Sequence, residues 1–394
     1  MKERRAVTKL ESGLVVLVLI FAGVAAYGFL AVAPGTTTTV TATLGAASPL
    51  SRLKVALILP IDPTDNSWNY QADSAVKALQ QAYGFTLNET YNKFTGTDAQ
   101  PAAVSYAQRG FNVIFLQGIQ YQTMASTIAP QYPNTLFVCV DCLARNASNV
   151  YLIWLDIGGA GFIEGAMAGM MSQSHIYGLV GGGRVPSIWA GHEGFKAGVL
   201  YTDPKAKTPF QETYEAFSWS DVAGATKTAN QEIASGADVV FSSGDGIDVG
   251  VLSAARAAST QVWATNAYTN LSSISAASGN NKVLLASIVV DWSIPYAAAL
   301  RAYVGGTWRN GFLTASIASG IVKVQPGPNV PANVKALAAR LQSNFLLQAL
   351  VISFQTDPKT STPVCFEQTT PVGQCTDTGT GNTAAQLNYL PPLV

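Results

Sequence analysis

Residues 113–155, VIFLQGIQYQTMASTIAPQYPNTLFVCVDCLARNASNVYLIWL, contain the pattern that decides the fold. Three nearly uninterrupted apolar runs, at 113–116, 136–140 and 150–155, are joined by a helical pattern and a turn-rich loop. Such runs are typical of parallel strands that are covered on both faces. Their alternation with helical segments predicts βαβ units and therefore an α/β fold.

The same alternation continues on both sides of this segment. Because 394 residues exceed what one hydrophobic core usually supports, we expect two lobes. The predicted strands are residues 55–59, 113–116, 136–140, 150–155, 176–180, 239–241, 262–264 and 284–290. The predicted helices are residues 68–82, 99–109, 122–131, 160–172, 188–200, 222–235, 249–258 and 292–303. Gly161, Gly165 and Gly169 predict a thin helix face that approaches the sheet.

The N-terminal region predicts a membrane anchor. Residues 13–33 carry no charge and are long enough to cross a hydrocarbon core of about 30 Å. The basic residues within 1–12 favour a cytoplasmic N-terminus. A cleaved signal peptide and a pilin-like leader cut near Gly13 are the alternatives. Residues 34–52 are interpreted as a Thr-rich tether, and residues 357–394 as a tail rich in Pro, Thr and Gly.

Composition and motifs argue against several function classes. Lys plus Arg and Asp plus Glu both number 23, so no basic surface for nucleic acid is expected. Nucleotide-binding, hydrolase and metalloprotease motifs do not occur, so we expect no enzyme, cofactor or metal. Cys365 and Cys375 flank a loop that a disulfide would close. Cys139 and Cys142 have the spacing of a redox motif, and the sequence leaves their state open.

Candidate binding residues follow from the positions where the predicted strands end. In open α/β sheets, ligands bind beyond the carboxyl ends of the strands. Those ends carry Gly118, Asp141, Gly244, Asp245 and Asn266. Glycine backbone amides and carboxylate or amide oxygens suit a neutral solute that presents hydroxyl or amide groups, whereas an anion would favour Lys or Arg.

Six motifs in order carry a family resemblance over residues 54–356. The strings are DNSWN at 65–69, RGFNVIF at 109–115, QYPNTLF at 131–137 followed by Asp141, GG at 181–182, GFKAG at 194–198 and GADVV at 236–240. Together they resemble the basic membrane protein family, the nucleoside-type substrate-binding lipoproteins that include the purine nucleoside receptors. The family's lipidated Cys near the N-terminus is missing, and the apolar run in its place suits an archaeal surface protein.

The resemblance implies a type I periplasmic-binding-protein fold, with two doubly wound parallel-sheet lobes joined by a hinge. The N-lobe would comprise residues 53–156 plus 292–318, and the C-lobe residues 157–291 plus 319–356. The lobes would close over a ligand in the cleft between them.

The resemblance also implies roles for individual side chains. Trp68 and Phe217 match the two aromatics that sandwich a nucleobase, and Asp141 and Asn69 would meet its polar edges. Two departures concern the sugar: Asn266 replaces an Asp, and Val289 and Val290 stand where a Lys is expected. The ligand-binding set predicted from strand ends and motifs together is Asp65, Ser67, Trp68, Asn69, Gly118, Asp141, Phe217, Gly244, Asp245 and Asn266.

These inferences predict an extracellular solute-binding receptor of an ABC importer. It would be held at the cell membrane by its N-terminal helix and would bind a nucleoside, nucleobase or similar small planar polar ligand. Its partners would be that ligand and the ABC permease subunits. A sensor domain that signals to a membrane partner, and a surface-assembly protein, are the alternative functions.

Overall fold

A computed structural model describes residues 48–65, 67–215, 218–268 and 280–346. The predicted membrane helix at 13–33, most of the tether, Phe217, the Cys365–Cys375 pair and the C-terminal tail lie outside these residues. Within the described ranges, no helix combines the length and apolar character needed to span a bilayer.

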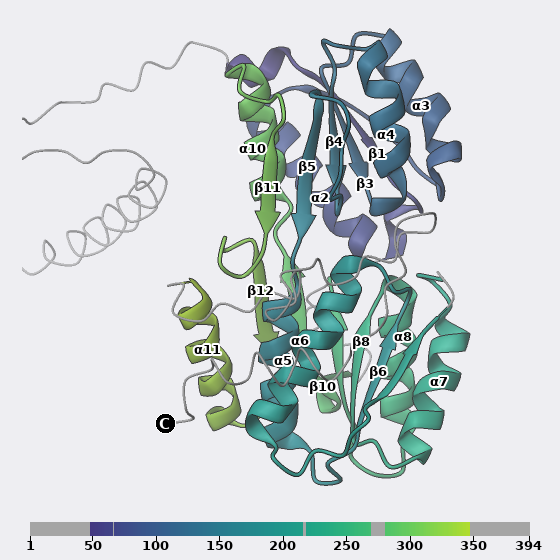
Figure 1. The fold of residues 1–394 in the computed structure, drawn as a ribbon, viewed down its shortest axis with the longest axis vertical. Helices are drawn as coiled ribbons and strands as arrows, with labels where there is room; N and C mark the ends of the chain where they lie inside the picture. The colour runs from purple at the N-terminus through teal and green to yellow at the C-terminus, as the bar shows by residue number, and fades with distance from the viewer. Residues whose placement is uncertain (1–47, 66, 216–217, 269–279, 347–394) are drawn as a thin grey trace, which may run out of the picture. The chain divides into compact units, whose positions relative to one another are not determined.

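Two six-stranded sheets organise the described chain (Figure 1). The first has the order β11-β5-β4-β3-β1-β2 and is parallel throughout. The second has the order β12-β10-β9-β8-β6-β7, in which β12 alone runs antiparallel, against β10. The strands are β1 Lys54–Ile58, β2 Thr86–Thr90, β3 Val113–Gln117, β4 Leu136–Val140, β5 Val150–Leu155, β6 Tyr177–Gly181, β7 Gln211–Tyr214, β8 Val239–Ser243, β9 Trp263–Ala267, β10 Leu284–Val290, β11 Phe312–Ala315 and β12 Val322–Pro326. The predicted pair of parallel-sheet α/β lobes is confirmed.

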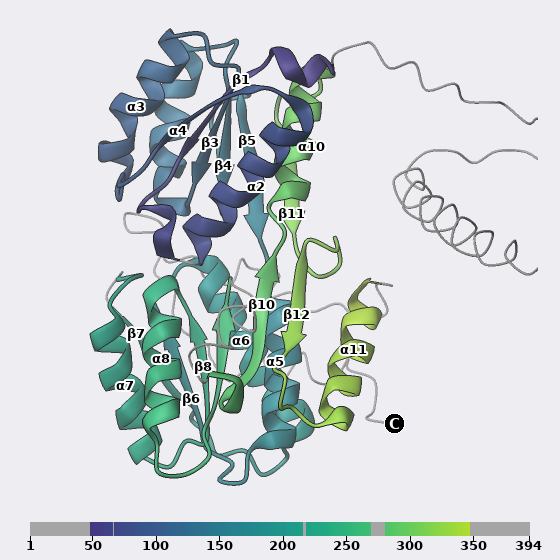
Figure 2. The same cartoon turned by 180° about the vertical axis from the view of Figure 1, so that it is seen from behind.

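Helices cover both faces of each sheet, as Figures 1 and 2 show from opposite sides. In β1, Val55 and Leu57 belong to one apolar cluster, while Ala56 and Ile58 belong to another on the opposite face. This double burial explains the uninterrupted apolar runs in the sequence. The α-helices are α2 Trp68–Tyr83, α3 Gly96–Gln108, α4 Gln122–Ile128, α5 Gly158–Met171, α6 Pro186–Thr202, α7 Val222–Ala234, α8 Asp245–Ala257, α10 Ser293–Val304 and α11 Ala332–Leu346.

Short 3-10 helices occupy several of the connections. They are η1 Pro49–Arg52, η2 Pro63–Asp65, η3 Ile119–Tyr121, η4 Ala129–Gln131 and η5 Asn280–Lys282. The helix η1 corrects the end of the tether predicted at residues 34–52, because it occupies the last four of those residues. Leu50 is buried in the N-lobe core, so the chain is already packed at η1.

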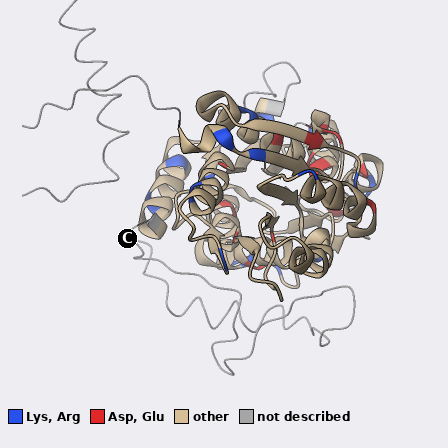
Figure 3. Cartoon of the chain, turned by 90° about the horizontal axis from the view of Figure 1, so that it is seen from above, with Lys and Arg blue, Asp and Glu red and all other residues tan. Residues whose placement is uncertain are grey.

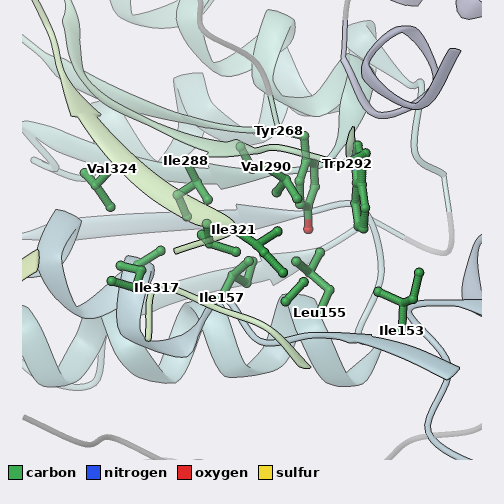
Figure 4. Packing of buried hydrophobic residues seen from close by; sticks show 14 of the residues in the cluster. Ile153, Leu155, Ile157, Tyr268, Ile288, Val290, Trp292, Ile317, Ile321 and Val324 are labelled. Atoms are coloured by element: carbon green, nitrogen blue, oxygen red, sulfur yellow. The ribbon is translucent and has the colours of Figure 1, made fainter. Parts of the chain in front are cut away.

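The chain crosses between the two sheets three times, after β5, after β10 and between β11 and β12. The crossings are bonded to each other: the Asp156 amide donates to Ala315 O at 2.9 Å, and the Asp291 amide to Ile321 O at 2.9 Å. Figure 4 shows buried apolar side chains gathered around these crossings. The labelled members are Ile153, Leu155, Ile157, Tyr268, Ile288, Val290, Trp292, Ile317, Ile321 and Val324. One hydrophobic cluster therefore continues from lobe to lobe.

The glycines of α5 face a helix, which corrects the prediction that they face the sheet. A Cβ added at Gly161 would lie 2.1 Å from Gly191 O, and one at Gly165 would lie 2.0 Å from Phe195 O. The reverse contact is equally close, since a Cβ at Gly194 would lie 2.0 Å from Gly158 O. Helices α5 and α6 thus pack backbone against backbone, and this packing fixes the position of the α6 N-terminus.

Candidate functional site

A cavity lies where the carboxyl ends of the strands of the two lobes meet. Its walls come from the N-termini of α2, α6 and α8 and from the loops that follow β1, β3, β4 and β9. A helix N-terminus carries the positive end of the helix dipole, which favours ligand oxygens or nitrogens that accept hydrogen bonds. The lining residues are Pro60, Trp68, Gly118, Ile119, Gln120, Asp141, Val185, Ser187, Ile188, Trp219, Gly244, Asp245 and Tyr268.

Two glycines shape the walls on opposite sides. Gly118 follows β3 with φ 147°, and Gly244 follows β8 with φ 149°. Both angles favour glycine, because a side chain there would be strained. Each residue turns the chain from a strand directly into a helical turn, so that the backbone itself forms part of the cavity wall.

Asp141 places a buried carboxyl at the junction of the lobes. Its Oδ2 accepts a hydrogen bond from Ser187 Oγ at 2.7 Å, which connects the end of β4 to the start of α6. Its Oδ1 is buried and has no hydrogen-bond partner among the described residues. Burial raises the pKa of Asp141 to about 7, although the Ser187 hydrogen bond opposes this rise. At the wall of the cavity, Asp141 therefore keeps one carboxyl oxygen without a hydrogen bond to any described residue.

Asp245 makes the reverse connection, from the C-lobe to the N-lobe. The backbone amide of Trp68 donates to Asp245 Oδ1 at 3.4 Å. Burial, followed by the negative charge of Asp65, raises the pKa of Asp245 to about 7. Each lobe thus contributes one carboxyl that is hydrogen-bonded to the opposite lobe.

Trp68 forms an aromatic wall whose orientation is fixed. Its indole Nε1 donates to Gln117 O at 3.3 Å. The ring packs edge-on against Tyr268, with centroids 5.1 Å apart, and against Trp292, with centroids 5.0 Å apart. The half-buried indole therefore lines the cavity without freedom to turn. Trp219 lines the cavity as well.

The structure brings five of the ten predicted site residues together in this cavity: Trp68, Gly118, Asp141, Gly244 and Asp245. Phe217 lies outside the described residues. The remaining four, which do not line the cavity, are Asp65, Ser67, Asn69 and Asn266.

The motif at 65–69 acts as a helix cap. Asp65 accepts hydrogen bonds from the amides of Asn69 and Tyr70, both at 2.9 Å, and from Asn69 Nδ2 at 2.7 Å. Such bonds satisfy the free donors that open α2. Asn69 is fully buried, and Asn266 is buried within β9. The motif therefore supports the site by holding Trp68 at the first position of α2.

Sequence reasoning missed Ser187 and Tyr268. Pro186 occupies the first position of α6, shortly after the glycines that end β6, and proline is common at that position of a helix. This pattern could have identified Ser187, the next residue, as part of a helix start near the site. Tyr268 follows the end of β9 with φ 69°. A tyrosine in that left-handed conformation has no pattern in the sequence that would have predicted it.

The charged groups that line the cavity are acidic. Among the described lining residues, Asp141 and Asp245 are present but neither Lys nor Arg. Figure 3 shows Lys and Arg distributed around the periphery of the described part rather than gathered at one place. In the described ranges, no group of three or more His, Cys, Asp or Glu residues is placed to hold a metal ion. The arrangement suits a ligand that donates hydrogen bonds.

Comparisons with known proteins identify the family and the fold. The family model described as "ABC transporter substrate-binding protein PnrA-like" (Bmp) matches residues 52–348. A purine-binding protein of Brucella abortus is 26% identical over 315 residues, which is 77% of this chain and 84% of that protein. A putative ABC transporter glucose-binding protein of Haloferax volcanii is 25% identical, over 72% of this chain and 69% of its own length.

Solved structures show the same fold. The ABC transporter solute-binding protein from Conexibacter woesei superposes with a TM-score of 0.61 at 22% identity, covering 76% of this chain and 98% of that one. Because the family model covers well over half of the chain, the chain belongs to the Bmp family of PnrA-like ABC transporter substrate-binding proteins.

Proposed function

We propose that this protein is the extracellular receptor of an ABC importer and binds a nucleobase, a nucleoside or a similar small planar polar ligand between its lobes. The observation that carries the proposal is the combination of a fixed indole wall, Trp68, with a buried carboxyl oxygen of Asp141 that is not hydrogen-bonded to any described residue. The protein would act by binding and release rather than by catalysis.

The chemistry of the cavity favours a nucleobase over an anion. A planar ring gains stacking energy on an aromatic face, about 1 to 3 kcal/mol per base. Ring N–H and amino groups donate to carboxylates, which accept on both oxygens when ionised. A phosphate would instead meet Asp141 and Asp245 with like charge. The proposed ligand is therefore uncharged or cationic and carries donors on its edge.

Recognition of the sugar is the weaker part of the site. Val290 is buried among the side chains around the crossings, and Val289 is half-buried and pairs with Lys323 of β12. Neither valine lines the cavity. We therefore expect a free base to bind at least as well as its ribonucleoside.

The location of the protein belongs to the same proposal. The uncharged run at 13–33 and the basic residues before it support a single anchor, with the binding lobes outside the cell. Protease added to intact cells should release a soluble fragment that contains the binding lobes. Complete protection of the lobes from protease would contradict this orientation.

Calorimetry with adenine, guanine, adenosine, guanosine and glucose tests the ligand class. We expect a purine to bind, and Trp68→Ala to weaken that binding roughly tenfold to a hundredfold through lost stacking. The matched control is Trp263→Ala, which removes a half-buried tryptophan from the start of β9, away from the cavity. Tight glucose binding that Trp68→Ala leaves unchanged would overturn the hypothesis that the ligand is a nucleobase.

A further inference from the structure

The Cys139–Cys142 disulfide lies directly beside the carboxyl that faces the cavity. Cys139 belongs to β4, Cys142 follows Asp141, and the two are bonded to each other and fully buried. Only Val140 and Asp141 stand between them. The covalent ring is therefore short enough to restrict the backbone of Asp141 itself.

Asp141 occupies a conformation that such a restriction would help to hold. Its φ of 60° lies in the left-handed region, which few residues other than glycine adopt, Asp being among those that adopt it more often. This turn takes the chain out of β4 while the Asp141 amide still donates to Ile153 O at 2.7 Å. In this conformation the carboxyl reaches Ser187 at 2.7 Å and lines the cavity.

The neighbouring chain is held independently of the disulfide. Gln122 Oε1 accepts hydrogen bonds from the amides of Leu143 and Ala144, at 2.7 and 2.9 Å. Residues 136–140 are paired with β3 on one side and β5 on the other. Loss of the disulfide would therefore leave the sheet and the following loop in place and would release mainly Asp141.

We propose that the Cys139–Cys142 disulfide is a positioning element of the ligand site, which holds Asp141 so that its carboxyl faces the cleft. The identity of the ligand rests on the proposed function, whereas the restriction of Asp141 does not. Affinity for the cleft ligand should then depend on the oxidised state of this pair. Reduction by a phosphine breaks the S–S bond and gives two thiols, while water supplies the two protons and the oxygen of the phosphine oxide.

The experiment uses the Cys365→Ser/Cys375→Ser variant of the full chain, in which Cys139 and Cys142 are the remaining cysteines. Because both cysteines are fully buried, labelling is done after denaturation: N-ethylmaleimide should label neither cysteine before treatment with tris(2-carboxyethyl)phosphine and both after it. Calorimetry with adenine, guanine, adenosine and guanosine should show that reduction weakens binding about tenfold, as expected when one hydrogen bond to a charged group is lost. Reoxidation should restore the affinity.

Asp141→Asn in the same background separates positioning from a general structural role. If the disulfide acts through Asp141, this variant already binds weakly, and reduction should change its affinity less than twofold. An equal loss on reduction with and without Asp141 would overturn the inference. Labelling of the thiols without reductant, or unchanged affinity after reduction, would also overturn it.

Hydrogen exchange gives a readout that needs no ligand. On reduction, the amides of residues 141 and 142 should exchange at least tenfold faster, while those of β3 and the Leu143 and Ala144 amides, which Gln122 holds, should not change. If none of the four purine probes binds, the proposed function fails, and exchange alone decides this inference. Unchanged exchange at residues 141 and 142 would then refute it.

Discussion

Substitution of Gly194 by alanine tests whether the contact between α5 and α6 sets the architecture of the C-lobe. The new Cβ would lie 2.0 Å from Gly158 O and 2.9 Å from the carbonyl carbon of the same residue. A carbon and a carbonyl oxygen normally stay about 3.3 Å apart or more. Because the obstacle is backbone, no side-chain rotation relieves it, and the helices must move apart by roughly 1 Å.

The magnitude follows from overpacking. Added methyl groups in a close-packed interior cost about 1 to 3 kcal/mol, and more where the backbone must move. We therefore expect Gly194→Ala to lower the free energy of unfolding by about 3 kcal/mol. At about 2 to 4 °C per kcal/mol for a domain of this size, the melting temperature should fall by about 6 to 12 °C. Ligand affinity should fall as well, because Ser187 and Ile188 lie at the start of α6.

Thermal unfolding followed by circular dichroism measures this effect, with Gly305→Ala as the matched control. Gly305 ends α10 at φ −77°, and a Cβ there would meet its nearest neighbour, Arg301 O, at 3.2 Å. That substitution should change stability by at most about 0.5 kcal/mol. Equal melting temperatures for the two variants would refute the backbone contact between α5 and α6.

Two further predictions concern buried charges. Asp141→Asn should flatten the pH dependence of stability. Burial raises the folded pKa of Asp141 from 3.8 to about 7, so the wild type loses on the order of 3 kcal/mol of stability as pH rises from about 4 to 7. Urea titrations at pH 4 and 8 should show that this loss is smaller in the variant. Lys196→Met should cost about 3 to 5 kcal/mol, because Glu193 and Glu212, bonded to Lys196 at 2.7 and 2.9 Å, would remain in the interior without it. Lys77→Met, which removes a half-exposed cation, should cost at most about 1 kcal/mol, and an equal effect of the two lysine substitutions would contradict this account.

The strands in the middle of the sheets could be predicted because burial on both faces leaves a continuous apolar run. β3 and β4 are fully buried, and both were found within one residue of their ends. The edge strands β2 and β7, with sequences TLNET and QETY, are partly exposed and polar. Tertiary packing decides whether such segments pair as strands, so their local sequence did not predict β2 and β7.

The glycines of α5 show a second limit of sequence reasoning. Spacing of four residues correctly predicted a face that another element approaches closely. It did not identify that element, because the partner glycines, Gly191, Gly194 and Gly198, belong to the next helix in the chain, two elements away. The close approach of α5 to α6 can be recognised only when the glycines of both helices are seen to face each other in the structure.

The candidate site was predictable where chemistry and topology coincide. Gly118, Asp141, Gly244 and Asp245 follow the ends of parallel strands, and that position alone brings them together. Family motifs added Asp65 and Asn69, whose polar groups serve the helix cap. A motif records which residues occur together, and it does not distinguish a residue that touches the ligand from one that holds its neighbour in place.

The two bonds across the cleft suggest how ligand and closure are coupled. Ser187 to Asp141 spans 2.7 Å, whereas the Trp68 amide to Asp245 spans 3.4 Å and is correspondingly weak. A hydrogen bond contributes about 0.5 to 1.5 kcal/mol net, so these two would bias an equilibrium between open and closed lobes only modestly. Trp68 and Asp141 both belong to the N-lobe, so a ligand that binds them would stabilise the closed arrangement through the additional contacts it makes with C-lobe lining residues such as Asp245. Those additional contacts are the differential affinity that a population shift requires. The apolar cluster around the crossings packs on both sides of the hinge, and we expect it to remain buried while the cleft opens and closes.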